Sequence, residues 1–170
     1  MPFRRLFNRI LHILARLLPG ALSVRPFLHR LRGVKIGKDV FIGDDVYLEN
    51  EYPEAVEIQR GAQISVRAII IAHTRGAGGI VIGEDAFIGP NTVIASSGSR
   101  ILRIGEGAVI GAGVVVTRDV PAHVFFTSEG GKAVAGVRVP LSKAETMEEF
   151  MRGLVPIKRL SKPPVRRGGS

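Results

Sequence analysis

Large aliphatic residues recur every six positions through the middle of the chain. Each except Ile104, which follows Leu102, comes two positions after a small or β-branched residue, and Gly comes directly after six of them, at positions 37, 43, 83, 89, 105 and 111. The aliphatic series is Ile36, Ile42, Leu48, Ile58, Ile64, Ile70, Ile82, Ile88, Ile94, Ile104, Ile110 and Val116. Such a unit predicts a short strand with two inward side chains and then a turn, where Gly adopts backbone angles closed to other residues.

The series keeps its phase of six in groups of three, which predicts a solenoid rather than an open sheet. Three units make one triangular coil of about 18 residues, and stacked coils bury their apolar side chains against each other. An ordinary β-sandwich would show alternating strands, but not one phase held over about 80 residues. We therefore predict an all-β solenoid, a parallel β-helix of about four triangular coils over residues 33–125.

Three insertions interrupt the repeat. The step is ten from Leu48 to Ile58, twelve from Ile70 to Ile82 and ten from Ile94 to Ile104. Each insertion follows the third unit of a coil, so all three should stack at one corner. Irregular loops on a regular scaffold are where functional sites are usually built.

His73 begins the longest insertion and is followed by Thr74, Arg75 and a Gly-rich run. We expect residues 49–51 on one side of it and residues 96–100 on the other. A histidine ionises near neutral pH and can take a proton from a hydroxyl, so His73 is a candidate general base. The alternative is a histidine on a surface loop with no catalytic role.

The repeat resembles the hexapeptide-repeat acyltransferases, in particular those that O-acetylate sugars and polysaccharides. The stretches that carry the resemblance are "VKIGKDVFIGDDVYLENEYPEAVEI", "IVIGEDAFIGPNTVI" and "RIGEGAVIGAGVVVTRDVP". The resemblance implies a left-handed helix, a homotrimer, and a CoA site between adjacent subunits. It also implies acetyl-CoA as cosubstrate, a sugar or glycan acceptor, and direct transfer with no metal and no acyl-enzyme.

The resemblance assigns roles to residues at matching positions. It implies His73 as general base and polar acceptor contacts at Glu49 and Asn50. We add that Glu49 is placed to orient the imidazole, and that Arg75, in the same insertion, is a substrate-binding candidate. Positions that hold the CoA arm and its phosphates correspond to Ala112, Thr117 and Arg118. The segment "DVPAHVFFTSEGGKAVAGVRVPL" departs from the family pattern after this point, and Lys132 is the expected substitute contact.

Composition narrows the chemistry further. The 170 residues include no Cys, which excludes disulfides and thiol nucleophiles. A zinc enzyme built on a β-helix needs three histidine ligands, which the repeat does not supply, and we expect no metal. The net charge is +9, but the basic excess lies in residues 1–35 and 152–170, so we expect no nucleic-acid partner.

The N-terminal segment, residues 1–32, is predicted to be helical and amphipathic. Apolar residues follow helical spacing over residues 1–18, with Arg and other polar residues on the opposite side, and Pro19-Gly20 ends the helix. This pattern favours docking on an anionic membrane surface, and the alternative is a helix that only covers the end of the solenoid. Residues 27–32 should cap the first coil.

The C-terminal residues and the other histidines have no motif that assigns them a function. We expect a C-terminal extension over residues 126–160, with a short helix at 145–154, and a disordered basic tail at 161–170. The histidines outside the repeat corner, His12, His29 and His123, are interpreted as surface or interface residues.

The function predicted from sequence is a CoA-dependent O-acetyltransferase that acts on a sugar or glycan precursor. Two alternatives stay open: N-acylation of an amino sugar, and a catalytically inactive scaffold that assembles membrane partners. The expected location is cytoplasmic, peripheral on the inner face of the cell membrane.

Overall fold

The structure, a computed structural model, describes residues 2–74, 78–128, 135–137, 146–152 and 154–156. The chain divides into two units, residues 1–128 and residues 129–170, and the first contains the whole predicted repeat.

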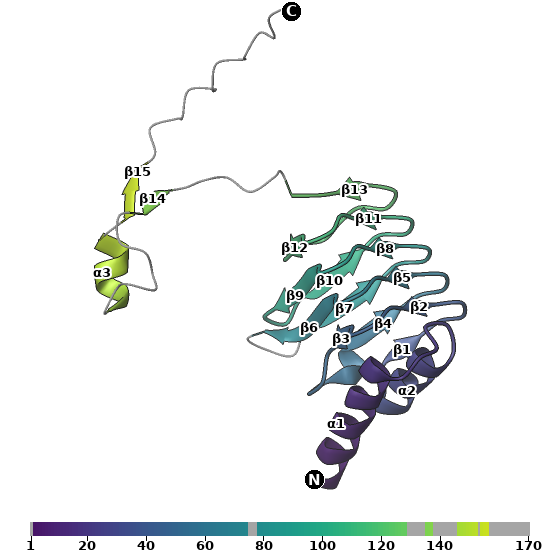
Figure 1. The fold of residues 1–170 in the computed structure, drawn as a ribbon. Coiled ribbons are helices and arrows are strands. Elements are labelled where there is room, and N and C mark those ends of the chain that lie inside the picture. The colour runs from purple at the N-terminus through teal and green to yellow at the C-terminus, as the bar shows by residue number, and fades with distance from the viewer. Residues whose placement is uncertain (1, 75–77, 129–134, 138–145, 153, 157–170) are drawn as a thin grey trace, which may run out of the picture. The chain divides into compact units, whose positions relative to one another are not determined.

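Three parallel sheets form the three walls of a solenoid (Figure 1). The first wall contains β1 (Lys35–Ile36), β4 (Val56–Ile58), β7 (Gly79–Ile82) and β10 (Ile101–Ile104). The second contains β2 (Phe41–Ile42), β5 (Gln63–Ile64), β8 (Phe87–Ile88), β11 (Val109–Ile110) and β13 (Phe125–Phe126). The third contains β3 (Tyr47–Leu48), β6 (Ile69–Thr74), β9 (Val93–Ser97) and β12 (Val115–Val116).

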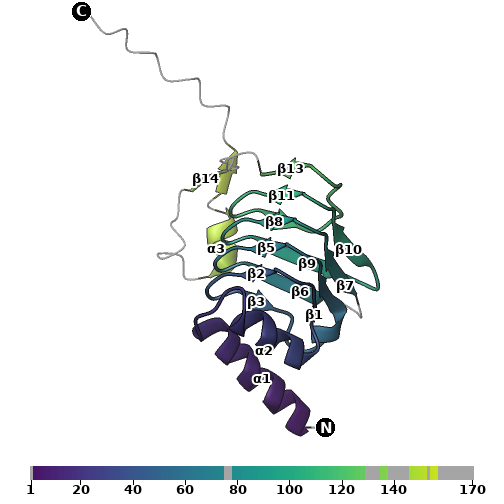
Figure 2. The ribbon, with the colours of Figure 1, turned by 90° about the vertical axis from the view of Figure 1, so that its right-hand side faces the viewer.

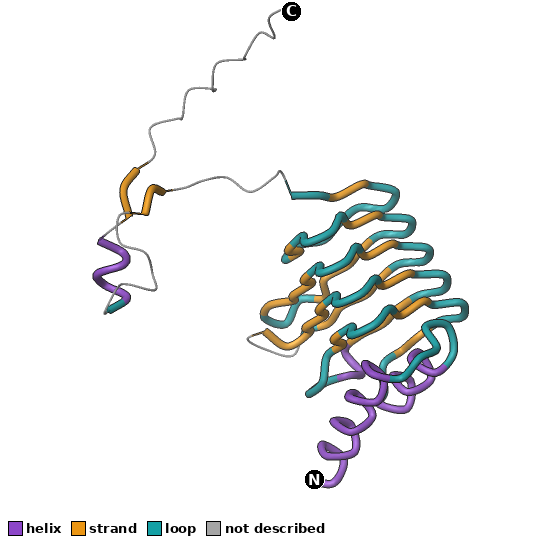
Figure 3. Tube along the Cα trace, in the orientation of Figure 1, coloured by secondary structure: helices purple, strands orange, loops and turns teal. Residues whose placement is uncertain are grey.

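This architecture confirms the predicted β-solenoid of about four coils. Each strand pairs in parallel with the strand one coil away, and turns separate the short strands at the corners (Figure 3). A fifth coil begins beyond the predicted series, because Val120 bridges Ile104 and β13 pairs with β11. The left hand of the helix stays a prediction.

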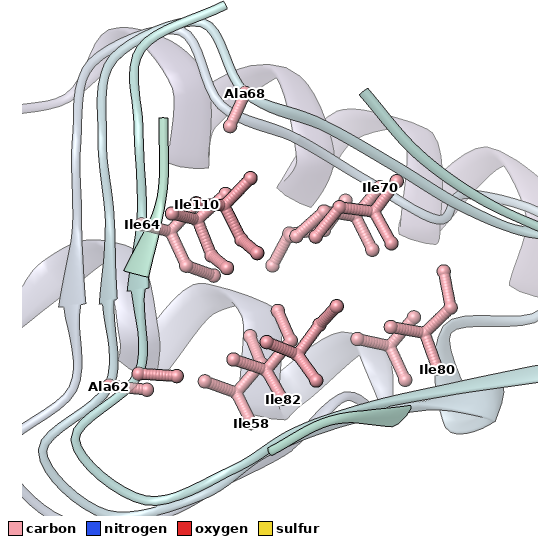
Figure 4. Packing of buried hydrophobic residues seen from close by; sticks show 14 of the residues in the cluster. Ile58, Ala62, Ile64, Ala68, Ile70, Ile80, Ile82 and Ile110 are labelled. Carbon is pink, nitrogen blue, oxygen red and sulfur yellow. The ribbon is translucent and has the colours of Figure 1, made fainter. Parts of the chain in front are cut away.

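The core consists of aliphatic columns that run along the solenoid. Ile58 stands in register with Ile82, Ile64 with Ile88, and Ile70 with Ile94. Figure 4 shows these inward side chains gathered from the three walls, with no polar atom among the residues drawn. Of the aliphatic series, Ile36 in the first coil is partly buried and the others are buried. The six-residue phase therefore specifies the core.

The physical reason predicted for the repeat glycines is wrong. Gly83, for example, does not adopt a positive φ; a Cβ there would lie 2.7 Å from the backbone nitrogen of Glu106 in the next coil. Close approach of successive coils is what favours glycine at such positions. The left-handed turn residues lie elsewhere in each unit, at Asp39, Asp45, Gly61, Arg67, Asp85, Asn91, Gly107, Gly113 and His123.

Two helices close the first coil (Figure 2): α1 (Pro2–Leu17) and α2 (Val24–Arg32). Helix α2 ends at Gly33, whose φ of 106° is left-handed. The Arg25 guanidinium donates to the carbonyl of Ile42 at 3.1 Å, and Arg16 Nε donates to Asp45 at 2.8 Å. These bonds attach the helices to the solenoid. Within the predicted cap, residues 27–32, Arg32 donates to the carbonyl of Leu48 in the first coil at 3.3 Å.

The second unit contains α3 (Met147–Arg152), which lies within the predicted helix 145–154. Strands β14 (Ala135–Val137) and β15 (Leu154–Pro156) pair antiparallel. The predicted disordered tail, 161–170, lies outside the described residues. Among the helices that the structure describes, none combines the length and hydropathy required to span a membrane.

The columns give a stability prediction. Ile64→Ala should lower the free energy of unfolding by about 2–5 kcal/mol, because Ile64 is fully buried and the rigid ladder cannot collapse into the cavity. Gln63→Ala, on the same strand but exposed, should change it by less than about 0.5 kcal/mol. Urea unfolding followed by circular dichroism measures both, and equal losses would contradict the assignment of the core.

Candidate active site

The three insertions lie between the third wall and the first wall, so they stack at one corner as predicted. The first contains the 3₁₀ turn η1 (Pro53–Ala55), which leads into β4. The other two connect β6 with β7 and β9 with β10. Part of the extra length extends the third wall itself, since β6 and β9 continue well past the two-residue strands β3 and β12.

Glu49 lies at the base of this corner and is completely buried. Its Oε1 accepts hydrogen bonds from the backbone N–H groups of Glu51 (2.8 Å) and Tyr52 (3.2 Å). Its Oε2 accepts from the N–H of Ala72 (2.8 Å) and from Nδ1 of His73 (2.5 Å). The carboxylate therefore joins the insertion of the first coil to that of the second.

These contacts keep Glu49 ionised despite its burial. Burial alone would raise the pKa of the carboxyl group, but the hydrogen bond from His73 and the three backbone N–H groups outweigh it. The pKa of Glu49 therefore lies below its ordinary value, and a fixed negative charge faces the imidazole.

The contact with Glu49 fixes the tautomer of His73. An ionised carboxylate can only accept, so in the neutral imidazole Nδ1 carries the hydrogen and Nε2 is left as the acceptor. The His73 side chain is 36% exposed, whereas Glu49 is buried beneath it. This is the arrangement of a general base: one nitrogen is held by a carboxylate and the other can receive a proton.

An irregularity in β6 sets the position of His73. From Ile71 to Thr74 the strand advances three residues, while its partner β9 advances two, from Ala95 to Ser97. The additional residue forms a bulge next to the histidine, and bulges commonly redirect side chains near functional sites.

A pocket of about 210 Å³ opens at His73. Its lining consists of Tyr52, Glu54, Ala55, His73 and Gly78. The Tyr52 and His73 rings lie 5.9 Å apart between centroids. Gly78 is tightly enclosed, since a Cβ there would lie 2.7 Å from Ser96 Oγ and 2.9 Å from the carbonyl oxygen of Ala72.

The structure brings some of the predicted site residues together and separates others. Glu49 and His73 are in contact, and Asn50 Oδ1 accepts a hydrogen bond from Arg32 at 3.3 Å. Thr117 and Arg118 follow β12. In the third wall β12 lies two strands away from β6, which carries His73, so the two strands are about 10 Å apart. Ala112 lies at a different corner, between β11 and β12; Arg75 and Lys132 lie outside the described residues.

The exposed CoA candidates have few contacts of their own. Arg118 lies over the Phe126 ring at 6.0 Å, and the Thr117 carbonyl accepts from Arg100 at 2.6 Å. In the part of the chain that the structure describes, no group of three or more His, Cys, Asp or Glu side chains could hold a metal ion.

Comparison with known proteins agrees with this geometry. Residues 79–118 match a family model described as the hexapeptide repeat of succinyl-transferase. The match lies within the solenoid, from β7 to the residues after β12. Residues 79–118 are therefore similar to this hexapeptide repeat. No curated protein matches the chain. The family description supports an acyl-transferring class of enzyme.

The protein also has a buried polar cluster that the sequence did not reveal. The interpretation of His12 and His29 as surface or interface residues is wrong, since both are buried between the helices and the first coil. Arg32 donates to His29 Nδ1 (2.8 Å) and to the backbone carbonyl of Glu49 (2.7 Å). The N-terminal helices therefore support the Glu49 backbone, a role that no local sequence signal indicated.

Both buried histidines are held neutral. Burial, followed by the nearby charges of Arg32 and Arg16, lowers the pKa of His12 to about 4. Burial, followed by Arg32, lowers the pKa of His29 to about 3. The unfolded chain, with histidine pKa values near 6.5, therefore binds more protons than the folded protein between about pH 6.5 and pH 4.

Stability should consequently decrease as the pH falls through about 6.5. His12→Phe should reduce the loss of unfolding free energy between pH 7 and pH 5 by about 2 kcal/mol, because one buried neutral group is removed. Denaturant unfolding at the two pH values provides the measurement. His123→Asn, at an exposed turn, is the control and should leave the difference unchanged. An unaltered pH dependence in His12→Phe would contradict the assignment.

Proposed function

We propose that this protein is a CoA-dependent O-acetyltransferase that transfers the acetyl group of acetyl-CoA to a hydroxyl of a sugar or glycan precursor. The observation that carries the proposal is the Glu49–His73 pair, whose geometry leaves Nε2 as the acceptor next to a pocket. The repeat match supplies the acyl-transferring class.

In the proposed reaction, His73 Nε2 takes the proton of the acceptor hydroxyl as the oxygen attacks the thioester carbonyl. The new C–O bond forms and the C–S bond breaks, and the departing sulfur receives the proton from the imidazolium. Glu49 stabilises the positive charge that develops on the ring, since its carboxylate already accepts from Nδ1. The step needs neither a metal nor an acyl-enzyme.

The remaining roles belong to the same proposal. Asn50 contributes to the acceptor side, while Ala112, Thr117 and Arg118 contribute to the CoA arm; all three CoA candidates are exposed. Arg118 carries the charge that suits a phosphate. Arg75 and Lys132 keep their proposed roles in substrate and CoA binding.

The proposal includes a cyclic homotrimer with the CoA site between neighbouring subunits. Exposed apolar side chains on the outer surfaces of two walls support it: Phe41, Phe87, Val109 and Phe125 on the second wall, and Ile69 and Val115 on the third. Surfaces of this kind on a soluble scaffold mark contact regions.

An assay of thiol release from acetyl-CoA with a panel of sugars tests the activity. His73→Ala should lower kcat roughly 10²–10⁴-fold, about 3–5 kcal/mol in activation free energy, with little change in CoA affinity. Glu49→Gln should also lower kcat, because an amide cannot accept from four donors. Glu51→Gln is the matched control: its exposed side chain is changed, but its N–H still donates to Glu49.

The outcomes separate the alternatives. Wild-type turnover in His73→Ala would remove the proposed mechanism, and absence of thiol release with every acceptor would favour the inactive scaffold. Hydroxylamine cleaves an acetyl ester but not an acetamide, so a resistant product would indicate N-acylation.

Light scattering of the purified protein at micromolar concentration should give three times the mass of the chain. Val115→Glu, which places a charge on a 63% exposed position of the third wall, should lower that mass if the wall is an interface. A monomeric wild-type protein would contradict the trimer and the shared CoA site.

A further inference from the structure

Helix α1 contacts the rest of the protein with its smaller and more polar side. The inward residues are Asn8, Leu11, His12 and Ala15, all buried. The large apolar residues of the same helix point outward and are exposed: Leu6, Phe7, Ile10, Ile13, Leu14 and Leu17. This helix therefore covers the first coil and still leaves its main apolar face without a partner in the described chain. The two roles considered for it, cap and docking surface, involve different faces.

The second helix and its connection enlarge the exposed apolar area. Leu22, Val24, Phe27 and Leu31 are exposed as well. We refer to these four residues and the six outward residues of α1 as the outer helical face. Figures 1 and 2 both show α1 and α2 at the purple end of the solenoid.

The charge within residues 1–35 is of one sign, and Arg4, Arg16 and Arg25 of this segment pair with Glu54, Asp45 and Asp44 of the solenoid. Residues 1–35 contain eight Lys and Arg and no Asp or Glu. Arg5 and Arg9 are exposed on the stripe of α1 that borders the apolar residues, because positions four apart share one side of a helix. An apolar face bordered by arginines is the pattern of a helix that lies in the plane of an anionic membrane.

The same charge argues against a second copy of the chain as the occupant. Pairing two outer helical faces would bring two sets of arginines together, and residues 1–35 provide no carboxylate to neutralise them. Anionic lipid headgroups would neutralise the arginines while the apolar side chains enter the acyl boundary.

We propose that the outer helical face docks on the surface of an anionic membrane, so that the protein is peripheral. The docking is independent of the transferase assignment. Its position has a consequence for the site, however. Arg4, Arg5 and Asn8 of α1 line a hollow together with Tyr52 and Glu54, and these last two residues also line the pocket at His73. The docking end of the molecule therefore borders the candidate active site.

Vesicle flotation of the full-length chain tests the docking. The protein should float with vesicles of phosphatidylglycerol and phosphatidylcholine and partition at least about tenfold less to phosphatidylcholine alone. Phe7→Gln/Ile10→Gln should reduce partitioning to the anionic vesicles by at least about tenfold, because two apolar side chains no longer enter the lipid. Ile101→Gln, on the first wall and as exposed as Phe7 (47%), is the control and should float as wild type.

A fluorescence measurement reports the docking residue by residue. The chain contains no Trp, so a single introduced Trp is the only one present. Emission of Phe7→Trp should shift to the blue on addition of anionic vesicles and be quenched by brominated lipid. Emission of Ile101→Trp should do neither. Since both positions are exposed, circular dichroism should show that each variant keeps the fold.

Three results would overturn the proposal. The first is failure of the wild type to float with anionic vesicles, and the second is equal flotation of Phe7→Gln/Ile10→Gln and wild type. The third is a lower light-scattering mass for Phe7→Gln/Ile10→Gln in the absence of lipid, which would show that a second copy covers the face. None of these readouts requires acetyl transfer, so failure of the docking and failure of the proposed function are distinguishable.

Discussion

The stacking of aliphatic side chains in register along the solenoid is the constraint on which the other features depend. Ile64, for example, is held between Ile42 in the coil before and Ile88 in the coil after, and no single coil could bury it. A column of this kind forms only if the backbone of every coil follows the same course. Extra residues are therefore tolerated only where they leave the columns undisturbed, which here is the corner between the third and first walls.

The corner is organised by one buried carboxylate. Loops without a regular ladder leave backbone N–H groups in need of partners, and Glu49 accepts from three of them as well as from His73. The same residue thus holds two insertions together and orients the imidazole. Arg32 holds the carbonyl of Glu49 from below, so the helical cap belongs to the support of the site as much as to the end of the fold.

The cap itself combines two requirements that compete on one helix. Its inward side must pass close over the first coil, which favours a small residue such as Ala15 and leaves His12 and His29 buried among arginines. Except for Leu11, the large apolar residues described in this helix then face outward. An amphipathic pattern alone does not tell which side of a helix contacts the protein, because water, lipid and a neighbouring element can each be the partner.

The sequence by itself determined the coil, its three walls, the corner that holds the insertions, and His73 and Glu49 as a pair at that corner. It could do so because, in a repeat of fixed length, the position of a residue in the sequence gives its position in the coil. Only the tertiary structure decided what depends on contacts between coils: the bulge that sets His73, the close approach that favours Gly83, the Arg32 contact with Glu49, and the burial of His12 and His29. These contacts join residues far apart in the chain, and no local pattern of residue types encodes them.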